Sequence, residues 1–182
     1  MRTPTLHTPR LRLEPIGLQH AASLQPLFAD PQVLRFLSAN VPNPYPDDGM
    51  QWFLENVLLP QVEAGVAMAW AIVPTAVDAA VGVLEWRREP GDEGDRGFWL
   101  GRPYWGQGLM TEAVTAFQDF VFFKVGLERM ELRSGVDNHG SRRLKEKTGC
   151  VKIGQATGAL HEGSLLDVWE ITRERWATLR GR

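Results

Sequence analysis

The chain has 182 residues, 43% of them hydrophobic, and a formal net charge of −2 at pH 7, which predicts one globular domain over 1–182 and excludes a disordered chain. It contains no basic stripe suited to nucleic acid and no apolar run long enough to span a membrane, so we expect neither partner. The single Cys150 and four scattered histidines provide no disulfide and no metal motif, so we also expect no metal and a cytoplasmic location.

Helix-like and strand-like patterns follow one another along the chain without an internal repeat. Apolar residues three and four positions apart predict helices, and short apolar runs bounded by Gly or Pro predict strands. In chain order we expect a strand at 11–13, a helix at 19–29, a short helical piece at 33–37, a loop at 40–46, a helix at 48–63, strands at 68–73 and 81–86, a loop at 89–95, a strand at 97–101, a long helix at 109–124, a strand at 129–133, a helix at 141–148 and strands at 150–153 and 168–172. This order indicates a mixed α+β fold.

The most informative segment is the glycine-rich turn from Trp105 to Thr111, which follows an aromatic-rich strand and opens the longest helix. The first amide groups of a helix have no partner within it, and its N-terminus carries about half a positive charge. Because Gly106 and Gly108 remove side-chain bulk, these amides can close around a pyrophosphate.

The glycines alone leave two other interpretations open. The turn can be purely structural, or it can belong to a dinucleotide fingerprint. Thr111 occupies the third glycine position of that fingerprint, but an acid lies about 20 residues further on (Glu128 or Glu131), where the fingerprint needs one. A nucleotide-binding oxidoreductase therefore stays an alternative, behind a non-catalytic binding or regulatory module.

Y-W-G-x-G-x-x-T-E-A occupies 104–113, and N-x-x-S-x-x-x-x-x-K-x-G is present as Asn138, Ser141, Lys147 and Gly149. These two linked motifs resemble the coenzyme A half of the GNAT N-acetyltransferases, and most of all their RimJ/RimL branch. Thr8 to Leu13 and the segment 167–176 are similar to the opening and closing parts of that family. The resemblance implies a GNAT-like acyl-CoA N-acyltransferase fold, in which helices flank a central, twisted, mostly antiparallel sheet.

The resemblance also implies that acetyl-CoA is the co-substrate. The backbone of Trp99 to Gly101 would pair with the pantetheine arm and supply an N–H to the thioester oxygen. The amides of Gln107 to Thr111 would hold the pyrophosphate, and Asn138 would bind the arm near its thiol. The residues expected to bind acetyl-CoA are Trp99, Leu100, Gly101, Trp105, Gly106, Gln107, Gly108, Leu109, Met110, Thr111, Asn138 and Ser141.

Ser141 is the candidate general acid for the departing thiolate, although Ser and Asn also favour helix caps. No G-x-S-x-G or His-linked triad accompanies it, so direct attack by the amine is preferred to an acyl-enzyme. Glu85, Glu162 and Asp167 are candidate bases, and each is also readable as a solvated or structural carboxylate. At pH 7 an α-amine is about 10% neutral and a lysine about 0.04%, so a chain without a conspicuous base favours an α-amine.

The expected acceptor is an amine: a protein N-terminus, an amino acid or another small molecule. The densest basic cluster, Arg142, Arg143, Lys145 and Lys147, suits one phosphorylated small molecule and is too small for a polyanion.

An exposed sheet edge would support a homodimer. Met110 replaces the Gly or Ala usual in the wider family, and we expect it to narrow the freedom of the turn.

Overall fold

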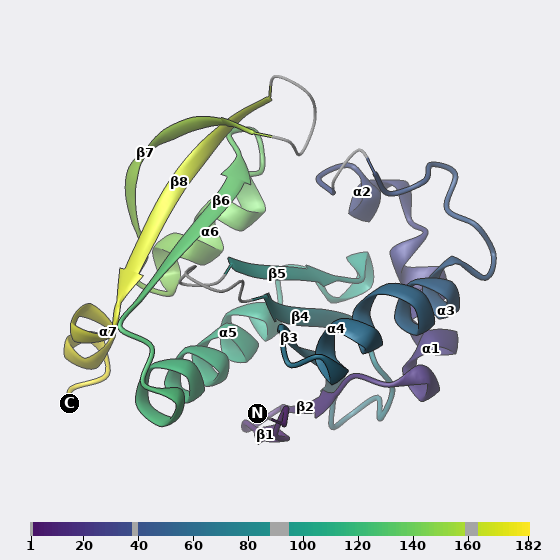
Figure 1. Ribbon diagram of the computed structural model, residues 1–182, viewed down its shortest axis with the longest axis horizontal. Helices are drawn as coiled ribbons and strands as arrows, with labels where there is room; N and C mark the ends of the chain where they lie inside the picture. The colour runs from purple at the N-terminus through teal and green to yellow at the C-terminus, as the bar shows by residue number, and fades with distance from the viewer. Residues whose placement is uncertain (1, 38–39, 88–94, 159–163) are drawn as a thin grey trace.

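Two antiparallel sheets form the frame of the molecule (Figure 1). The computed structural model describes residues 2–37, 40–87, 95–158 and 164–182. The first sheet has the order β1 (Leu6–His7), β2 (Leu11–Pro15), β3 (Ala67–Pro74), β4 (Gly82–Arg87) and β5 (Asp95–Leu100), and the second has the order β6 (Arg129–Gly135), β8 (Ser164–Thr172) and β7 (Val151–Gly158). The mixed α+β class is confirmed, and the central sheet expected from the sequence is divided into two.

The helices connect and cover these sheets. In chain order they are η1 (Leu18–His20), α1 (Ala21–Phe28), α2 (Pro31–Leu34), α3 (Gly49–Phe53), η2 (Leu54–Leu58), α4 (Leu59–Glu63), η3 (Arg102–Tyr104), α5 (Leu109–Phe120), η4 (Val121–Val125), α6 (His139–Lys147) and α7 (Arg173–Leu179). The segments η2 and η4 are π-helical turns, so the helices expected at 48–63 and 109–124 are each continuous with a change of pitch. No helix among the described residues is both long and apolar enough to cross a membrane.

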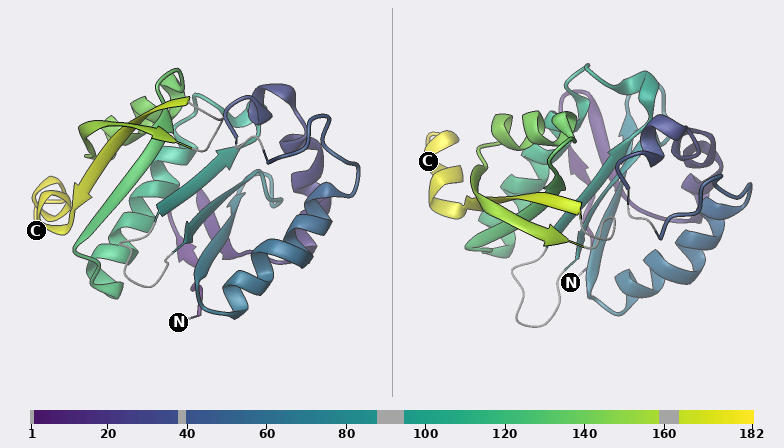
Figure 2. Two further views of the ribbon diagram at one scale, coloured as in Figure 1. Left: turned by 45° about the horizontal axis from the view of Figure 1, so that its top comes forward. Right: turned by 90° about the horizontal axis from the view of Figure 1, so that it is seen from above.

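Alternation along the strands divides the interior into two cores. In β4, Leu84 and Trp86 face the central core, whereas Val83 faces the outer core on the opposite side of the first sheet. The central core joins both sheets to α5, α6 and α7; its large members include Trp70, Phe117, Phe122, Leu132, Trp169 and Trp176. The outer core lies under the helices of residues 18–63, which cover the far side of the first sheet in both views of Figure 2.

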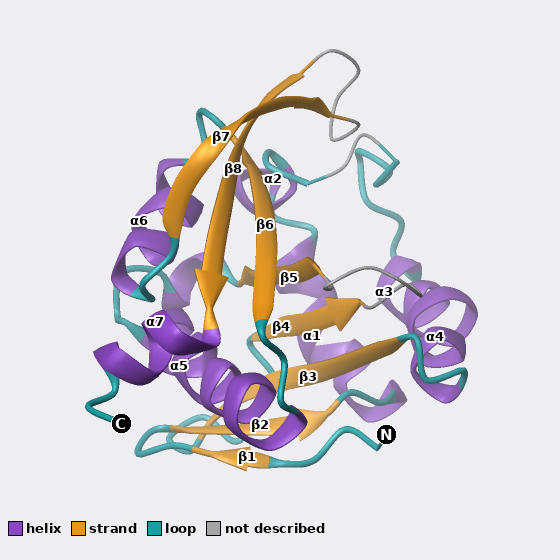
Figure 3. Cartoon of the chain, turned by 60° about the vertical axis from the view of Figure 1, so that its left-hand side comes forward, coloured by secondary structure: helices purple, strands orange, loops and turns teal. Residues whose placement is uncertain are grey.

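The two sheets come nearest to each other at β5 and β6 (Figure 3). Within the described residues β5 forms a ladder with β4 alone, and β6 forms a ladder with β8 alone. The backbone of β5 therefore presents an open edge toward the second sheet. The glycine-rich turn follows this strand after the short helix η3.

Candidate active site

The turn before α5 has a backbone that only glycine adopts readily. Gly106 and Gly108 have φ values of 74° and 77°. The first hydrogen bond of the helix runs from the amide of Glu112 to the oxygen of Gly108 at 3.0 Å, so the amides of residues 109–111 precede it and have no acceptor within the helix. A Cβ built on Gly106 meets nothing within 4 Å, so the space before the turn is open. Such a turn has the backbone geometry that can bind an anionic group.

The turn between β1 and β2 supports this helix start from the side. Glu112, in the first turn of α5, accepts hydrogen bonds from Thr8 Oγ1 at 2.6 Å, the Arg10 amide at 2.8 Å and Arg10 Nε at 2.7 Å. Although partial burial opposes it, these bonds lower the pKa of Glu112 and keep the carboxylate ionised. Arg10 Nη1 also donates to the oxygen of Gln107 at 3.0 Å. Glu112 therefore has a structural role at the start of α5. In the sequence, its position in the T-E-A part of the motif was the feature that could have indicated this role.

Two side chains connect the turn to β5 and to η3, the segments before it. Trp105 Nε1 donates to the oxygen of Leu100 at 2.5 Å, and Gln107 Nε2 donates to the oxygen of Pro103 at 2.8 Å. Trp105 is 45% exposed, so its indole stabilises the turn through this bond and not as part of a core. Both residues were expected to bind acetyl-CoA, and the structure shows that both side chains stabilise the turn.

The open edge of β5 distinguishes Leu100 from its two neighbours. The Gly101 amide donates to Val81 beside β4 at 2.8 Å. Because the backbone groups of successive strand residues point to opposite sides, those of Trp99 also face β4 and those of Leu100 face the open edge. The bond from Trp105 already occupies the Leu100 oxygen from that side. Of the three residues expected to bind the pantetheine arm, Leu100 is therefore the one that directs its N–H toward the open edge.

Met110 does not alter the glycine geometry of the turn. It lies inside α5, and among the described residues Asp78 is the one non-glycine residue with a positive φ. The Met110 side chain is half-buried and packs against the central core, while its amide stays at the open start of the helix. The Met110 side chain was expected to restrict the conformation of the turn, and the backbone of the turn shows no such restriction.

The start of α6 is capped by a side chain. Asn138 is the N-cap residue, and its Oδ1 accepts a hydrogen bond from the Ser141 amide at 3.0 Å. The Ser141 hydroxyl has a different partner, because its Oγ accepts from Lys145 Nζ at 2.7 Å. Lys145 is 2% exposed, although the sequence analysis placed it in a basic cluster suited to a phosphorylated small molecule. Its spacing of four residues from Ser141 on a helix was the signal for this pair.

Glu85 lies on the outer-core face of the first sheet. Its cross-strand neighbours are Ala69 and Gly97, and a Cβ on Gly97 would lie 2.5 Å from Glu85 Oε1. The Glu85 side chain is 17% exposed, and Arg87 donates to its Oε2 at 3.0 Å. On β5, Trp99 and Gly97 share this face, so Glu85 is set beside Trp99, whose ring packs edge-on against Phe28 at 4.9 Å.

Asp167 lies on the second sheet, apart from Glu85. It is 4% exposed, forms an ion pair with Lys152 and accepts from Gln155 Nε2 at 3.0 Å. The hydrogen bond from Lys152 is the largest cause that lowers the pKa of Asp167, with Gln155 and the charge of Arg142 adding to it and burial opposing it. A lowered pKa weakens a carboxylate as a base. Glu162, the third candidate base, lies outside the described residues.

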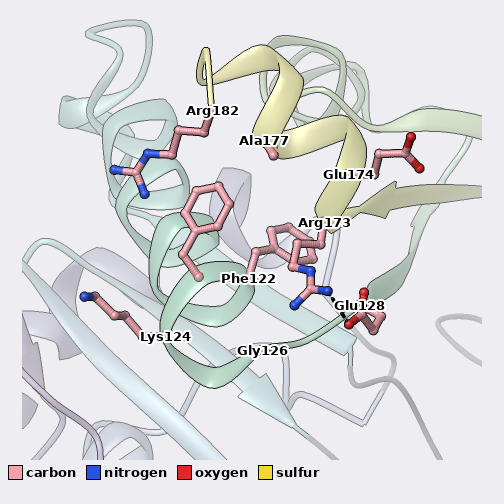
Figure 4. A pocket seen from close by; sticks show the side chains of 9 residues that line it. Phe122, Lys124, Gly126, Glu128, Arg173, Glu174, Ala177 and Arg182 are labelled. Carbon is pink, nitrogen blue, oxygen red and sulfur yellow. Dashed lines mark ion pairs between the residues drawn. The ribbon is translucent and has the colours of Figure 1, made fainter.

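A surface hollow of about 710 Å³ lies at the opposite end of α5 from the turn. Figure 4 shows it between η4 and α7, with the ion pair between Glu128 and Arg173 on its wall. It shares no residue with the glycine-rich turn, Ser141 or the candidate bases. Among the residues that the structure describes, no three His, Cys, Asp or Glu side chains gather as metal ligands would.

Comparison with known proteins identifies the family. Residues 10–151 match the family described as the Acetyltransferase (GNAT) domain, which is more than half of the chain. The chain belongs to the GNAT acetyltransferase family. It is therefore an acetyltransferase, the activity that the resemblance of its two motifs implied.

Similar proteins extend over nearly the whole chain. The uncharacterized N-acetyltransferase p20 of Bacillus licheniformis is 26% identical over 168 residues, which cover 91% of this chain and 93% of the relative. The FsC-acetyl coenzyme A-N(2)-transacetylase of Aspergillus fumigatus is 25% identical and covers 97% of this chain and 80% of its own. The solved structure of RimL, a ribosomal L7/L12 alpha-N-protein acetyltransferase in complex with coenzyme A, has a TM-score of 0.80 at 17% identity, covering 93% of this chain and 98% of that one. This likeness confirms the expected GNAT fold.

The dinucleotide-binding interpretation of the turn is wrong. A dinucleotide fingerprint connects parallel strands through a helix, whereas β5, the strand before the turn, pairs antiparallel with β4. The family match leads to the same conclusion. The glycines of the turn belong to an acetyltransferase.

Proposed function

We propose that this chain transfers an acetyl group from acetyl-CoA to an amine by direct attack of the amine on the thioester. The observation that carries the proposal is the turn of Gly106 and Gly108, which leaves the amides of residues 109–111 without an acceptor in the helix and has open space at Gly106. A helix start of this kind favours a phosphate group both by its amides and by its dipole. The family of the chain supports this assignment.

The donor is proposed to lie along the β5 edge from the turn toward α6. The amides of α5 hold the pyrophosphate, and the N–H of Leu100 donates to the pantetheine arm or to the thioester oxygen as charge develops there. Asn138 caps α6 through Oδ1, so its amide nitrogen is the group that contacts the donor arm. Ser141 donates a proton to the departing sulfur.

Glu85 is the proposed base, acting directly or through one water. It lies on the face of β4 and β5 that also presents Trp99, whereas the pKa of Asp167 is lowered by its bond to Lys152. Ion pairing makes Asp167 a structural carboxylate that connects β7 to β8. The expected test is a pair of variants: Glu85→Gln lowers kcat by about 100-fold or more, and Asp167→Asn lowers it by less than about 10-fold.

The proposed acceptor is an α-amine on a peptide, an amino acid or another small molecule. An α-amine, with a pKa near 7.8, is deprotonated far more often at neutral pH than a lysine, so it needs less help from a base. The name of RimL, an alpha-N-protein acetyltransferase, is consistent with that class of acceptor. The outer core also contributes aromatic side chains beyond Trp99, because Phe28 packs edge-on against Trp99 at 4.9 Å and against Tyr45 at 4.7 Å. Burial raises the pKa of Tyr45 to about 12.

The whole chain is proposed to act as one cytoplasmic domain, with a homodimer formed through β7. The central core joins both sheets, which supports a single folding unit. The strand β7 is an edge of the second sheet, and Val151 and Ile153 on it are 42% and 49% exposed. Such an edge can pair with a second copy of itself. Sedimentation of the purified protein tests the dimer.

Thermal unfolding with acetyl-CoA, CoA and NAD tests the donor, and thiol release with a panel of amines tests catalysis. A ligand at 100 times its dissociation constant stabilises the native state by about 2.7 kcal/mol, so acetyl-CoA and CoA should raise the Tm clearly and NAD should not. Turnover should be fastest with free α-amines. Binding without turnover of any amine would support a non-catalytic acyl-CoA-binding module, and no shift with acetyl-CoA would overturn the proposal.

A further inference from the structure

A buried lysine is hydrogen-bonded to Ser141, the proposed general acid. Lys145 is 2% exposed, Ser141 is 7% exposed, and the Nζ of the lysine donates to the Oγ of the serine at 2.7 Å. The two residues are four positions apart on α6 and so share one face of the helix. Leu144 beside them packs into the central core, which shows that this face of α6 is covered by protein.

The serine hydroxyl is directed by this lysine and not by the helix end. Asn138 already caps α6 by accepting the Ser141 amide, so the hydroxyl has no capping role. Because Oγ accepts from Lys145, the O–H of Ser141 is left to donate in another direction. Placing a charged amine in the interior costs free energy, which an apolar side chain of the same length would not. The hydrogen bond at 2.7 Å therefore places this amine where it can direct the Ser141 hydroxyl.

We propose that Lys145 is a positioning residue for acyl transfer, which holds the Ser141 hydroxyl as the proton donor to the departing sulfur; this rests on the proposed role of Ser141. As the C–S bond breaks, its electron pair goes to sulfur and the Oγ–H proton of Ser141 passes to it. A proton from the ammonium group of Lys145 passes to Oγ, so the serine ends neutral. Solvent then returns a proton to Lys145. The attacking nitrogen loses its proton to the base, which passes it to solvent.

A positive charge behind the hydroxyl strengthens it as a donor to a thiolate. The ionisation of the CoA thiol in the enzyme–CoA complex, followed by its ultraviolet absorbance, measures this effect without turnover. Lys145→Met should weaken the acidity of the bound thiol by about 10-fold, which is one pKa unit. The same variant should lower kcat by about 10- to 100-fold and leave the KM for acetyl-CoA within about threefold.

Three further variants separate a positioning role from a structural one. Lys145→Gln keeps a donor to Oγ without the transferable proton, and should fold even where Lys145→Met does not, with kcat lowered and KM retained. Ser141→Ala combined with Lys145→Met should be no slower than Ser141→Ala alone, because the lysine acts through the serine. Lys124→Met removes an exposed positive charge at the far end of α5 and should match the wild type in kcat and thiol ionisation.

The outcomes distinguish this inference from the proposed function. A wild-type protein that releases no thiol with any amine contradicts the proposed function itself. A wild type that turns over, together with Lys145 variants of unchanged kcat and unchanged thiol ionisation, overturns the role of Lys145 even if their Tm falls. Additive losses in the double variant overturn it as well.

Discussion

The two helix starts that face the proposed donor differ in whether a side chain accepts a hydrogen bond from their first amides. At α6, Asn138 supplies a side-chain oxygen to the Ser141 amide at 3.0 Å. At α5, the N-cap is Gly108, which has no side chain to offer, and the amides of residues 109–111 precede the first helical bond. The capped start holds a side chain in place, and the uncapped start leaves its amides for a ligand.

We propose that this difference separates donor binding at α5 from proton transfer at α6. Without a capping side chain, α5 depends for its stability on contacts from outside, chiefly on Thr8 and Arg10 through Glu112. With its cap complete, α6 can commit the Ser141 hydroxyl to Lys145. Substitutions that interchange these arrangements should therefore have distinct and separable effects.

The largest effect is expected from a carboxylate placed at the uncapped start. Gly106→Asp should weaken CoA binding by about 100-fold or more, because two like charges about 4 Å apart repel by roughly 4 kcal/mol near a protein surface. Gly65→Asp is a matched control, since Gly65 has a φ of 75° against 74° and an equally open Cβ position, but lies away from the turn. Calorimetric titration with CoA gives both affinities. Equal affinities in the two variants would contradict a phosphate site at this turn.

The support from β1 and β2 should be the next largest contribution. Glu112→Gln removes the charge that binds Thr8 and Arg10 and should lower the free energy of unfolding at pH 7 by about 1–2 kcal/mol. Because the folded-state pKa of Glu112 is lowered, its stabilisation is present above the ordinary glutamate pKa of about 4.3 and is lost as the pH falls through the folded value. Urea unfolding at several pH values measures the difference.

The two proteins should therefore converge in stability at low pH. Glu55→Gln, a change at an exposed carboxylate on the opposite side of the first sheet, should alter stability by less than about 0.5 kcal/mol at any of these pH values. A gap between wild type and Glu112→Gln that widened in acid would contradict the assignment of Glu112 as an ionised support.

The cap of α6 should contribute about 1 kcal/mol. Asn138→Ala removes the acceptor for the Ser141 amide and should lower the free energy of unfolding by about that amount, whereas Asn138→Asp retains a capping oxygen and should restore it. Urea unfolding curves of the three proteins test this. If Asn138→Asp were as unstable as Asn138→Ala, the side chain would not act as the cap.

The smallest effect is expected at Met110. Met110→Leu conserves volume and leaves the amide in place, so CoA affinity should change by less than about twofold and stability by less than about 1.5 kcal/mol. The same calorimetric titration measures the affinity. A tenfold loss would show that the methionine side chain, and not the amide, contacts the donor.

Local pattern was sufficient to predict most elements and the location of the turn. The apolar period of 109–124 and the two glycines before it depend on neighbours within one helix, and the structure agrees with both. Contacts distant in sequence were not predictable in this way. The bonds from Thr8 and Arg10 to Glu112 span about a hundred residues, and the division of the sheet depends on how β5 and β6 meet.

Lys145 shows why a residue type can mislead. Four basic residues within six positions were expected to form one basic cluster, but a helix turns by about 100° per residue, so positions 142–147 cannot all lie on the same face. Lys145 shares the inner face with Ser141 and Leu144 and is buried. Asp167 was a candidate base, but in the structure it forms an ion pair with Lys152 on β7. This pair depends on the register of β7 against β8, which the sequence alone does not give.

Amide hydrogen exchange, measured residue by residue with and without CoA, is the most direct test of the central claim. Saturating CoA should slow exchange of the amides of residues 109–111 at the start of α5, and should change the Ser141 amide, already bonded to Asn138, far less. NAD at the same concentration should slow neither. Protection by CoA that spared residues 109–111 would contradict the account, because the donor would then be held elsewhere.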